Sequence, residues 1–250
     1  MKHEKIYIYG KHAVAEALAS SPRAITKVFL GKGFSDLLIR RAIEENRIPV
    51  SKLRPSTAAR VPGNFPSQKI MAVINPSELV GETEKFFSGL HINPDTLLVY
   101  LDKLHDPMNV GAVIRSASAL GASGVLFPSR GQAPITGSVI KASAGVAFHI
   151  PLVSVDRPSQ VFRDLKKKGF VVYGLAMKAS RSVFEEEFKR PTVLVVGNEG
   201  NGISKETFSF CDATLNIPMK PKTESLNAAV SVGIALGAWS NKHPLALRKK

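Results

Sequence analysis

Thr192-Val193-Leu194-Val195-Val196 runs directly into Gly197-Asn198-Glu199-Gly200-Asn201-Gly202, and this stretch decides the fold. Five consecutive strand-forming residues are typical of a parallel strand that is buried on both faces. A short helix is predicted next, and then a second strand that ends in Leu215-Asn216-Ile217-Pro218-Met219. Ligands bind at the carboxyl ends of strands in open α/β sheets, so we expect the chemistry at these two strand ends.

The composition indicates a globular protein that meets a polyanion. The chain has 250 residues, of which 44% are hydrophobic, and this is enough for one or two domains. Lys and Arg exceed Asp and Glu by 34 to 20, which gives a formal net charge of +14. A charge this high favours nucleic acid as a partner over a role in solubility alone.

The cysteine content and the apolar runs exclude several classes of protein. The single cysteine, Cys211, cannot form an internal disulfide or a cysteine zinc site, and it fits a reducing compartment. Residues 1–16 carry charges throughout and predict no signal peptide. No apolar run approaches the length of a membrane span. We therefore expect a cytoplasmic protein with no metal site and no membrane partner.

From Thr96 onward, strands and helices alternate, which predicts a mostly parallel sheet with helices on both faces. The expected strands cover residues 97–101, 125–127, 149–155 and 170–174, and the expected helices cover residues 106–120, 138–144 and 159–168. Asp106 followed by Pro107 is a strong helix start, and Gly121 suits the end of the same helix. We assign residues 96–250 to this α/β domain.

Residues 1–76 predict a smaller α/β domain of their own, with strands at 27–30 and 69–74 and helices at 13–18 and 35–46. Its basic residues include Lys11, Arg40, Arg41, Arg47, Lys52, Arg54 and Arg60. They either line an RNA-binding face or are scattered solvated charges, and the sequence favours neither for any one of them. Residues 77–95 are polar and rich in glycine and proline, so they predict the linker between the two domains.

A first group of candidate site residues lies on the helix predicted for residues 106–120. Arg115 is opposite the apolar stripe of this helix, and Gly111 leaves bare backbone one turn earlier. Asn109 lies in the first turn, near free backbone N–H groups. A cation and an amide at such a turn could hold a phosphate or a ribose. An exposed arginine and a capping asparagine are the alternative, but the costly interior glycine favours a site.

The glycine turn at residues 197–202 is the second group. Three glycines directly after a buried strand let the backbone approach a ligand closely. The spacing differs from that of a dinucleotide fingerprint, and no Gly-Lys-Ser/Thr follows as it would in a P-loop. Glu199 could orient a substrate, act as a base or pair with Arg115, and a plain polar turn is the alternative.

The third group is Ser225-Leu226-Asn227, at the start of a helix predicted for residues 226–239. Ser225 is the expected N-cap of this helix. The helix is rich in small residues, namely Ala228, Ala229, Ser231, Gly233, Ala235, Gly237 and Ala238. A helix that is small and apolar all round is buried, either in the core or against a second subunit.

Together the three groups resemble the motifs of the SpoU (TrmH-type) branch of the SPOUT RNA methyltransferases. The first is Asn109-x-Gly111-x-x-x-Arg115, the second is Gly197-x-Glu199-Gly200-x-Gly202, and the third is Ile217-Pro218-Met219 with Ser225-Leu226-Asn227. The resemblance covers residues 96–241. The front domain, with Tyr9-Gly10-Lys11-His12-Ala13-Val14, resembles the small L30e-like substrate-binding domain of many family members.

This resemblance implies a fold, a cofactor and a reaction. Family members contain an α/β domain whose C-terminal part is threaded into a trefoil knot, and they work as homodimers through the C-terminal helix. They transfer a methyl group from S-adenosylmethionine to a ribose 2′-hydroxyl in RNA. The chain looks most like the type that methylates a guanosine of large-subunit (23S-type) ribosomal RNA. The alternatives are a tRNA ribose methyltransferase and a catalytically silent RNA-binding factor for ribosome assembly.

The resemblance also implies which residues form the site. The catalytic set is Arg115, Asn109, Glu199, Ser225 and Asn227. The cofactor-binding set is Gly197, Ile217, Leu226, Leu175, Ala176, Gly202 and Met219. The family assigns the role of base to Arg115, but a guanidinium almost never loses its proton in a protein. Arg115 is therefore either the base or a clamp on the adjacent phosphate, and Glu199 is the rival base.

Overall fold

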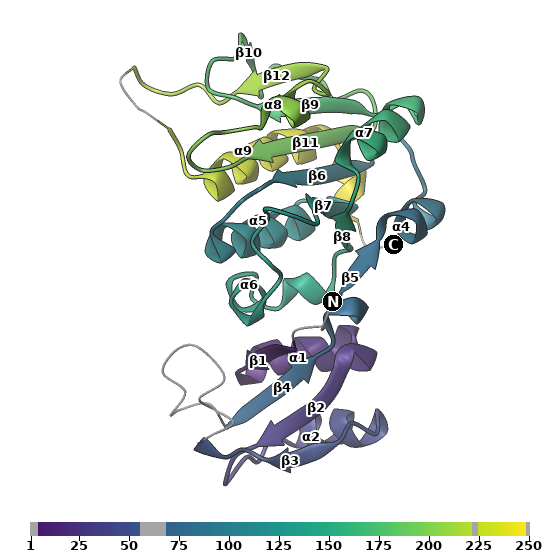
Figure 1. The fold of residues 1–250 in the computed structure, drawn as a ribbon, viewed down its shortest axis with the longest axis vertical. Coiled ribbons are helices and arrows are strands. Elements are labelled where there is room, and N and C mark those ends of the chain that lie inside the picture. The colour runs from purple at the N-terminus through teal and green to yellow at the C-terminus, as the bar shows by residue number, and fades with distance from the viewer. Residues whose placement is uncertain (1–4, 56–68, 222–224, 249–250) are drawn as a thin grey trace.

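Two β-sheets, each with its own helices, make up the protein (Figure 1). The computed structural model describes residues 5–55, 69–221 and 225–248. A four-stranded sheet lies at the N-terminal end of the chain, and an eight-stranded sheet is formed by the rest. The chain passes from one sheet to the other between β4 (Ile70–Ile74) and β5 (Val80–Glu82).

The small sheet has the strand order β1-β4-β2-β3. Its other strands are β1 (Ile6–Tyr9), β2 (Ile25–Leu30) and β3 (Val50–Lys52). β4 runs antiparallel to β1 and β2, whereas β3 runs parallel to β2 at the edge. Two helices accompany this sheet, α1 (Lys11–Ser20) and α2 (Leu37–Glu45). The side chain of Asp36 caps α2 by accepting a bond from the Ile39 N–H group.

The large sheet has the order β10-β12-β9-β11-β6-β7-β8-β5, and every neighbouring pair is parallel. The strands are β6 (Leu97–Asp102), β7 (Gly124–Pro128), β8 (Leu152–Val155), β9 (Val171–Leu175), β10 (Arg181–Ser182), β11 (Thr192–Gly197) and β12 (Ala213–Asn216). β11 lies between β9 and β6, and all six of its residues are buried. The buried parallel strand predicted at 192–196 is confirmed.

Helices cover both faces of the large sheet, as predicted (Figure 1). One face carries α5 (Pro107–Ala119), α6 (Gly137–Ala142) and α9 (Ala228–Lys242), and the other carries α4 (Thr83–Gly89), α7 (Pro158–Lys167) and α8 (Lys205–Phe208). β6 shows why both are needed, because Leu97 and Val99 belong to one apolar core while Leu98 and Tyr100 belong to the other. Short 3₁₀ helices lie at Pro22–Ala24, Pro76–Glu78, Val146–Phe148 and Pro244–Leu247.

Residues 77–95, which the sequence predicts to be a linker, contribute to the large sheet. β5 pairs with β8 over three residues as an edge strand. The helix α4 follows, and a Cβ placed on Gly124 would lie 2.8 Å from the Phe86 ring of this helix. A strand of three residues with a central glycine has little periodicity, so its sequence does not stand out from a loop. The division into domains at residues 76 and 96 stays a prediction.

Several element boundaries differ from those predicted, and three of them have a clear physical reason. The strand predicted at 149–155 begins only at Leu152, because a 3₁₀ helix precedes it. The strand predicted to end at Met219 ends at Asn216, two residues before a proline that cannot donate to a strand ladder. The last helix is capped by Asn227 and not by Ser225, since Asn227 Oδ1 accepts from the N–H groups of the next turn. Serine and asparagine cap equally well, so propensity could not separate them.

The two sheets also meet through side chains near α6. Lys141 Nζ lies 3.3 Å from the Tyr9 hydroxyl and sits over the same ring, 5.2 Å from its centroid. His149, just after the 3₁₀ helix at Val146–Phe148, lies 2.6 Å from the carboxylate of Glu16 in α1. α6 also packs directly on α5. One short helix therefore contacts both the small domain and the helix that carries the first motif.

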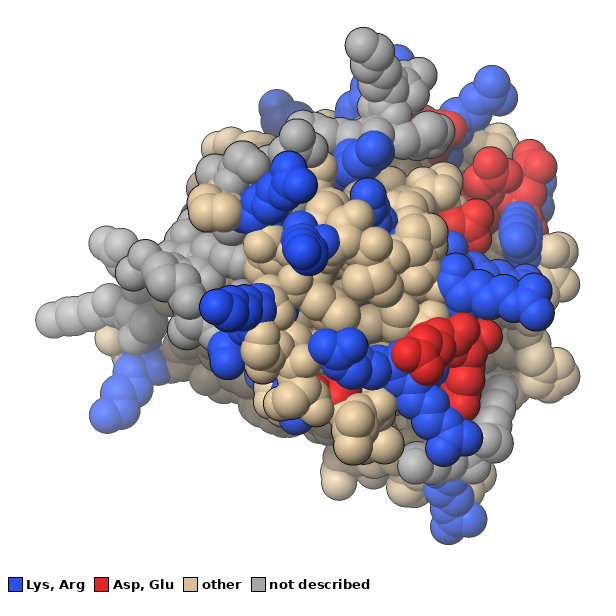
Figure 2. Space-filling model, turned by 90° about the horizontal axis from the view of Figure 1, so that it is seen from below, with Lys and Arg blue, Asp and Glu red and all other residues tan. Residues whose placement is uncertain are grey.

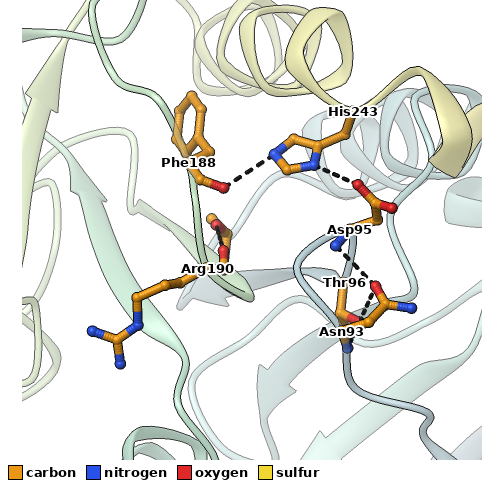
Figure 3. Close-up of polar contacts among 7 residues, drawn as sticks. Asn93, Asp95, Thr96, Phe188, Arg190 and His243 are labelled. Carbon is orange, nitrogen blue, oxygen red and sulfur yellow. Dashed lines mark hydrogen bonds and ion pairs between the residues drawn. The ribbon is translucent and has the colours of Figure 1, made fainter.

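A polar cluster around the buried His243 holds the C-terminal end of α9 (Figure 3). His243 Nδ1 lies 2.7 Å from Asp95 Oδ1, and Nε2 lies 3.1 Å from the Phe188 carbonyl oxygen. The imidazole also stacks on Trp239, with 4.4 Å between ring centroids. Asp95 precedes β6 and Phe188 precedes β11, so His243 ties α9 to the amino ends of two central strands. The start of α9 consequently lies at the opposite, carboxyl edge of the sheet.

Candidate functional site

A cavity of about 720 Å³ lies at the carboxyl ends of β9, β11 and β12. These strands are parallel neighbours, so their ends open on the same edge of the sheet. The apolar side chains of the lining include Leu175, Ile217 and Leu226, and the polar ones include Glu199 and Asn227. This size and mixed lining are typical of a site for a small molecule or a cofactor.

The glycine turn folds back on itself beside the cavity. The N–H groups of Asn198 and Gly202 each donate to the carbonyl of the other residue, both at 2.9 Å. A Cβ on Gly197 would overlap the backbone of Gly202 and Ile203, so no other residue fits there without moving the turn. The sequence predicts that these glycines admit a ligand. At Gly197, however, the missing side chain makes room for the other arm of the turn.

Two side chains hold the turn in this shape. Asn198 Oδ1 accepts hydrogen bonds from the N–H groups of Gly200 at 2.9 Å and Asn201 at 3.3 Å. Asp102, the last residue of β6, is only 2% exposed, and its Oδ2 accepts a 2.6 Å bond from the Ser204 N–H group. Bonds within the chain therefore hold the shape of the turn, and a turn fixed in this way lowers the entropic cost of binding a ligand.

Side chains from all three motifs form one hydrogen-bonded chain. Asn227 Nδ2 donates to Asn109 Oδ1 at 2.8 Å, and Asn109 Nδ2 donates to Glu199 Oε1 at 2.9 Å. This chain links the start of α9, the first turn of α5 and the turn after β11. Asn109 is buried and uses both ends of its amide, so the orientations of its two partners depend on it.

The structure brings ten of the twelve candidate residues to the wall of the cavity. They are Leu175, Ala176, Gly197, Glu199, Gly202, Ile217, Met219, Ser225, Leu226 and Asn227. Asn109 does not line the cavity, but it is bonded to two residues that do. Arg115 is exposed on α5, and the described residues offer it no hydrogen-bond or ion-pair partner. The pair of Glu199 with Arg115, one of the alternatives drawn from the sequence, is not formed.

Two family descriptions match the chain. The SpoU rRNA methylase family matches residues 96–237, which is more than half of the chain. The chain belongs to the SpoU rRNA methylase family. A second family, described as RNA 2′-O ribose methyltransferase substrate binding, matches residues 7–80. Each sheet of the structure thus falls largely within one family match.

Relatives of this SpoU chain cover almost its whole length. The 23S rRNA (guanosine-2′-O-)-methyltransferase RlmB of Pseudomonas putida is 33% identical over 235 residues, which are 92% of this chain and 93% of the relative. RlmB of Xanthomonas campestris is 32% identical over 241 residues, which are 94% and 96% of the two chains. The solved SpoU methyltransferase AviRb from Streptomyces viridochromogenes, in complex with the cofactor AdoMet, has a TM-score of 0.82 at 24% identity and covers 96% of this chain and 91% of its own. The predicted fold class, an α/β-knot domain with a small N-terminal α/β domain, is confirmed.

Hydrogen bonding lowers the pKa of Glu199 in the SpoU site. Partial burial alone would raise the pKa of this carboxyl. The hydrogen bonds from Asn109 and from the N–H groups of Glu199, His105 and Asp106 outweigh that effect, so the pKa falls below its ordinary value. A lower pKa makes the carboxylate a weaker base. The geometry therefore favours Glu199 as an acceptor that orients its neighbours over the rival base considered from the sequence.

Gly111 of the first SpoU motif serves the packing of two helices. A Cβ on Gly111 would lie 2.5 Å from Ala142 Cβ and 2.7 Å from the Val139 carbonyl oxygen, both in α6. The sequence favours a ligand beside Gly111, but α6 fills this space. The glycine lets α5 approach α6 closely, and it thereby positions Asn109, two residues earlier.

Sequence reasoning missed two residues beside the SpoU site, Lys103 and His105. Asn198 Nδ2 donates to the Lys103 carbonyl oxygen at 2.9 Å and lies 3.1 Å from His105 Nδ1. Lys103 has φ 61, a conformation that few residues other than glycine adopt. The loop that holds them has no periodicity. Its place between the end of a buried strand and a capped helix is the only signal in the sequence that could have marked it.

The part of the chain that the structure describes offers neither a metal site nor a reactive thiol. Among these residues, no three or more His, Cys, Asp or Glu side chains are grouped so that they could hold a metal ion. Burial raises the pKa of the Cys211 thiol to about 11, so this cysteine stays protonated at neutral pH. None of the described helices is long and apolar enough to cross a membrane.

Proposed function

We propose that this chain methylates the 2′-hydroxyl of a guanosine in large-subunit ribosomal RNA, with S-adenosylmethionine as the methyl donor. The observation that carries the proposal is the hydrogen-bonded chain Asn227–Asn109–Glu199 beside a cavity large enough for a cofactor. Relatives that match over nearly the whole chain bear the name 23S rRNA guanosine-2′-O-methyltransferase. A cytoplasmic location accords with an RNA of the ribosome as substrate.

The residues around the cavity fit S-adenosylmethionine. Leu175, Ile217 and Leu226 provide an apolar wall for an adenine ring, and the glycine turn and Ser225 provide polar groups for the ribose and the amino-acid end. When bound, the cofactor supplies a methyl group that its sulfonium has already activated. The protein then has to hold the two reactants in line and exclude other geometries, which is catalysis by positioning and requires no metal.

Basic side chains of the small domain provide a face for RNA. Figure 2 shows the molecule from the end that carries this domain, where Lys and Arg side chains surround an uncharged area. Three of the basic residues named from the sequence, Lys11, Arg40 and Arg41, are held by contacts within the domain. Arg60 lies outside the described residues.

Arg47, Lys52 and Arg54 are exposed, and the described residues give them no ion-pair partner. They lie on or beside β3, the edge strand of the small sheet. We infer that these three contact RNA phosphates. Replacing any one of them with alanine should reduce the slope of log RNA affinity against log salt concentration by about 1, the change expected for one lost phosphate contact. An unchanged salt slope for all three variants would refute this assignment.

We further propose that α9 packs against a second copy of the chain. Along this helix, nothing lies within 4 Å of a Cβ placed on Gly237, and Val230 is 49% exposed. Arg115 is exposed on α5, which packs beside α9. A second copy seated on α9 would cover Arg115 as well. The proposal therefore includes that Arg115 serves the cavity of the partner and not that of its own chain.

Two measurements test the reaction and the cofactor. Purified protein should bind S-adenosylmethionine and its demethylated product in a calorimeter, with no appreciable binding of NAD. Mapping of 2′-O-methyl groups in RNA from cells with and without the protein should reveal one guanosine of the large-subunit RNA. Folded protein that gives no heat with either sulfur cofactor would refute the proposal, and a methyl group missing from tRNA would replace the ribosomal substrate with tRNA.

Mixed dimers test whether Arg115 acts across the interface. Arg115→Ala and Asn227→Ala are each expected to be inactive alone. If Arg115 serves the partner, mixing the two variants creates dimers with one intact site, and part of the activity returns. If it serves its own chain, every site in the mixture carries a lesion and activity stays absent. Sedimentation of the wild type as a monomer at micromolar concentration would refute the dimer itself.

A further inference from the structure

His105 is an exposed side chain that is nevertheless held in one orientation at the edge of the cavity. It lies in the loop between β6 and α5, and its backbone N–H group donates to Glu199 Oε2 at 3.4 Å. Its ring Nδ1 lies 3.1 Å from Asn198 Nδ2, in the glycine turn. Fixing an exposed side chain in one orientation costs rotamer entropy, so such order needs hydrogen bonds to hold it. The loop is also strained, because Lys103, two residues before, has φ 61.

The contacts of Asn198 determine which ring nitrogen of His105 carries the proton. Asn198 Oδ1 faces the N–H groups of Gly200 and Asn201, so the amide cannot be turned around. Its Nδ2 group then donates one hydrogen to the Lys103 carbonyl oxygen and the other to His105 Nδ1. Nδ1 is therefore an acceptor, and the neutral imidazole carries its hydrogen on Nε2.

We propose that His105 is a substrate-binding residue, which donates its Nε2–H group to an acceptor atom at the target nucleotide. The described residues provide no partner for Nε2. Glu199 and Asn109, two members of the hydrogen-bonded chain that carries the proposed function, are bonded to each other next to this loop. The acceptor belongs either to the base, where guanine presents O6 and N7, or to a flanking phosphate. This inference rests on the proposed function and adds a contact with the substrate.

Two replacements separate a contact with the nucleotide from a structural role. His105→Asn keeps an acceptor near the position of Nδ1 and removes the donor at Nε2. His105→Gln keeps an N–H donor near the position of Nε2 and loses the acceptor at Nδ1. The variant His91→Asn is a matched control, because His91 is an exposed histidine in the segment before β6. All four proteins are compared in KM for a ribosomal RNA fragment, in kcat and in affinity for S-adenosylmethionine.

The expected result is a rise in KM of about tenfold for His105→Asn, which corresponds to one lost hydrogen bond. His105→Gln and the control should stay within about threefold of the wild type, and the affinity for the cofactor should be unchanged throughout. A fragment with an abasic ribose at the target position distinguishes the two acceptors. His105→Asn then matches the wild type if the acceptor is on the base, and it still binds more weakly if the acceptor is a phosphate oxygen.

A wild-type KM for His105→Asn, together with weaker cofactor binding for His105→Gln, would overturn the inference and leave His105 as a support for Asn198. Failure of the proposed function has a different signature, in which the wild type itself transfers no methyl group. The affinities of the same four proteins for the RNA fragment, measured by fluorescence anisotropy, would still decide the role of His105 in that case. Equal RNA affinities for the wild type and His105→Asn would refute it.

Discussion

Replacing Asn109 with alanine should uncouple the three motifs. In the intact protein, Asn109 Oδ1 accepts from Asn227 at 2.8 Å, and its Nδ2 donates to Glu199 at 2.9 Å. Asn109 is only 8% exposed, so water cannot easily replace its amide in the variant. Glu199 and Asn227 line the cavity and keep access to solvent, which limits the penalty for losing their partner.

The expected cost follows from the two bonds. A hydrogen bond to a charged group contributes about 1.5–3 kcal/mol, and one between neutral groups contributes about 0.5–1.5 kcal/mol. Because the two partners regain some solvent, the lower halves of these ranges apply. The free energy of unfolding should then fall by about 2–3 kcal/mol. In double-mutant cycles, the coupling of Asn109 with Glu199 should be about 2 kcal/mol and that with Asn227 about 1 kcal/mol.

Urea unfolding of the single and double alanine variants measures these energies, and calorimetry with S-adenosylmethionine measures the effect on the cavity. Asn46→Ala is a suitable control, because the Asn46 amide makes a single 2.8 Å bond to the Ala42 carbonyl oxygen at the end of α2. It should cost no more than about 1 kcal/mol and leave cofactor affinity unchanged. A coupling between Asn109 and Glu199 that is indistinguishable from zero would refute the hydrogen-bonded chain as an energetic unit.

Three further predictions concern the same site. Gly111→Ala should destabilise the fold by about 1–2 kcal/mol in urea unfolding, since overpacking against Ala142 outweighs the better helix propensity of alanine; an equal or higher stability would contradict the packing role. The pKa of Glu199 is lowered from its ordinary 4.5, so its charged form stabilises the folded protein above about pH 4.5 and this stabilisation is lost as the pH falls. Glu199→Gln should therefore flatten the acid side of the curve of unfolding free energy against pH. Arg115→Ala should abolish single-turnover methyl transfer while the affinity for the cofactor stays nearly unchanged, and near wild-type turnover in this variant would remove Arg115 from the site. Arg115→Lys should keep part of the activity if the site needs only a cation, and its pH profile should shift downward if Arg115 is the base.

The central architecture could be predicted because its signals are local. Continuous apolar runs such as that of β11 are typical of strands that are buried on both faces, and Asp106-Pro107 and Gly121 mark the ends of α5 directly. The short edge strands β5 and β10 could not be predicted, because two or three residues hold no periodicity. The strand order could not be predicted either, because it depends on pairing between segments that are distant in the sequence. The trefoil knot is an expectation from the resemblance alone, since general rules of topology argue against it.

At the site, residue identity was predictable but physical role was not. The motifs located the cavity residues, yet the reasons for Gly111 and Gly197 lie in contacts with α6 and with the far arm of the turn. Such contacts join segments that are distant in sequence, and helical or strand periodicity says nothing about them. His105 belongs to the same class, because its orientation depends on Asn198, 93 residues later in the chain.

The side-chain amides of Asn109 and Asn227 orient their neighbours through hydrogen bonds, and the chemistry falls to other groups. Asn227 caps α9 with its oxygen and donates to Asn109 with its nitrogen, so its polar atoms are already engaged. Among the described residues that line the cavity, the titratable side chains are Lys178 and Glu199, and the pKa of Glu199 is lowered by the bonds that orient it. A carboxylate with a lowered pKa is poorly suited to remove a proton from a hydroxyl. If the proposed reaction occurs, the described part of one chain supplies the positioning, and an exposed Arg115 beside α9 is the group that a second copy would add to the site. Activity should therefore fall with dilution below the dimer dissociation constant while cofactor binding to the remaining folded protein persists.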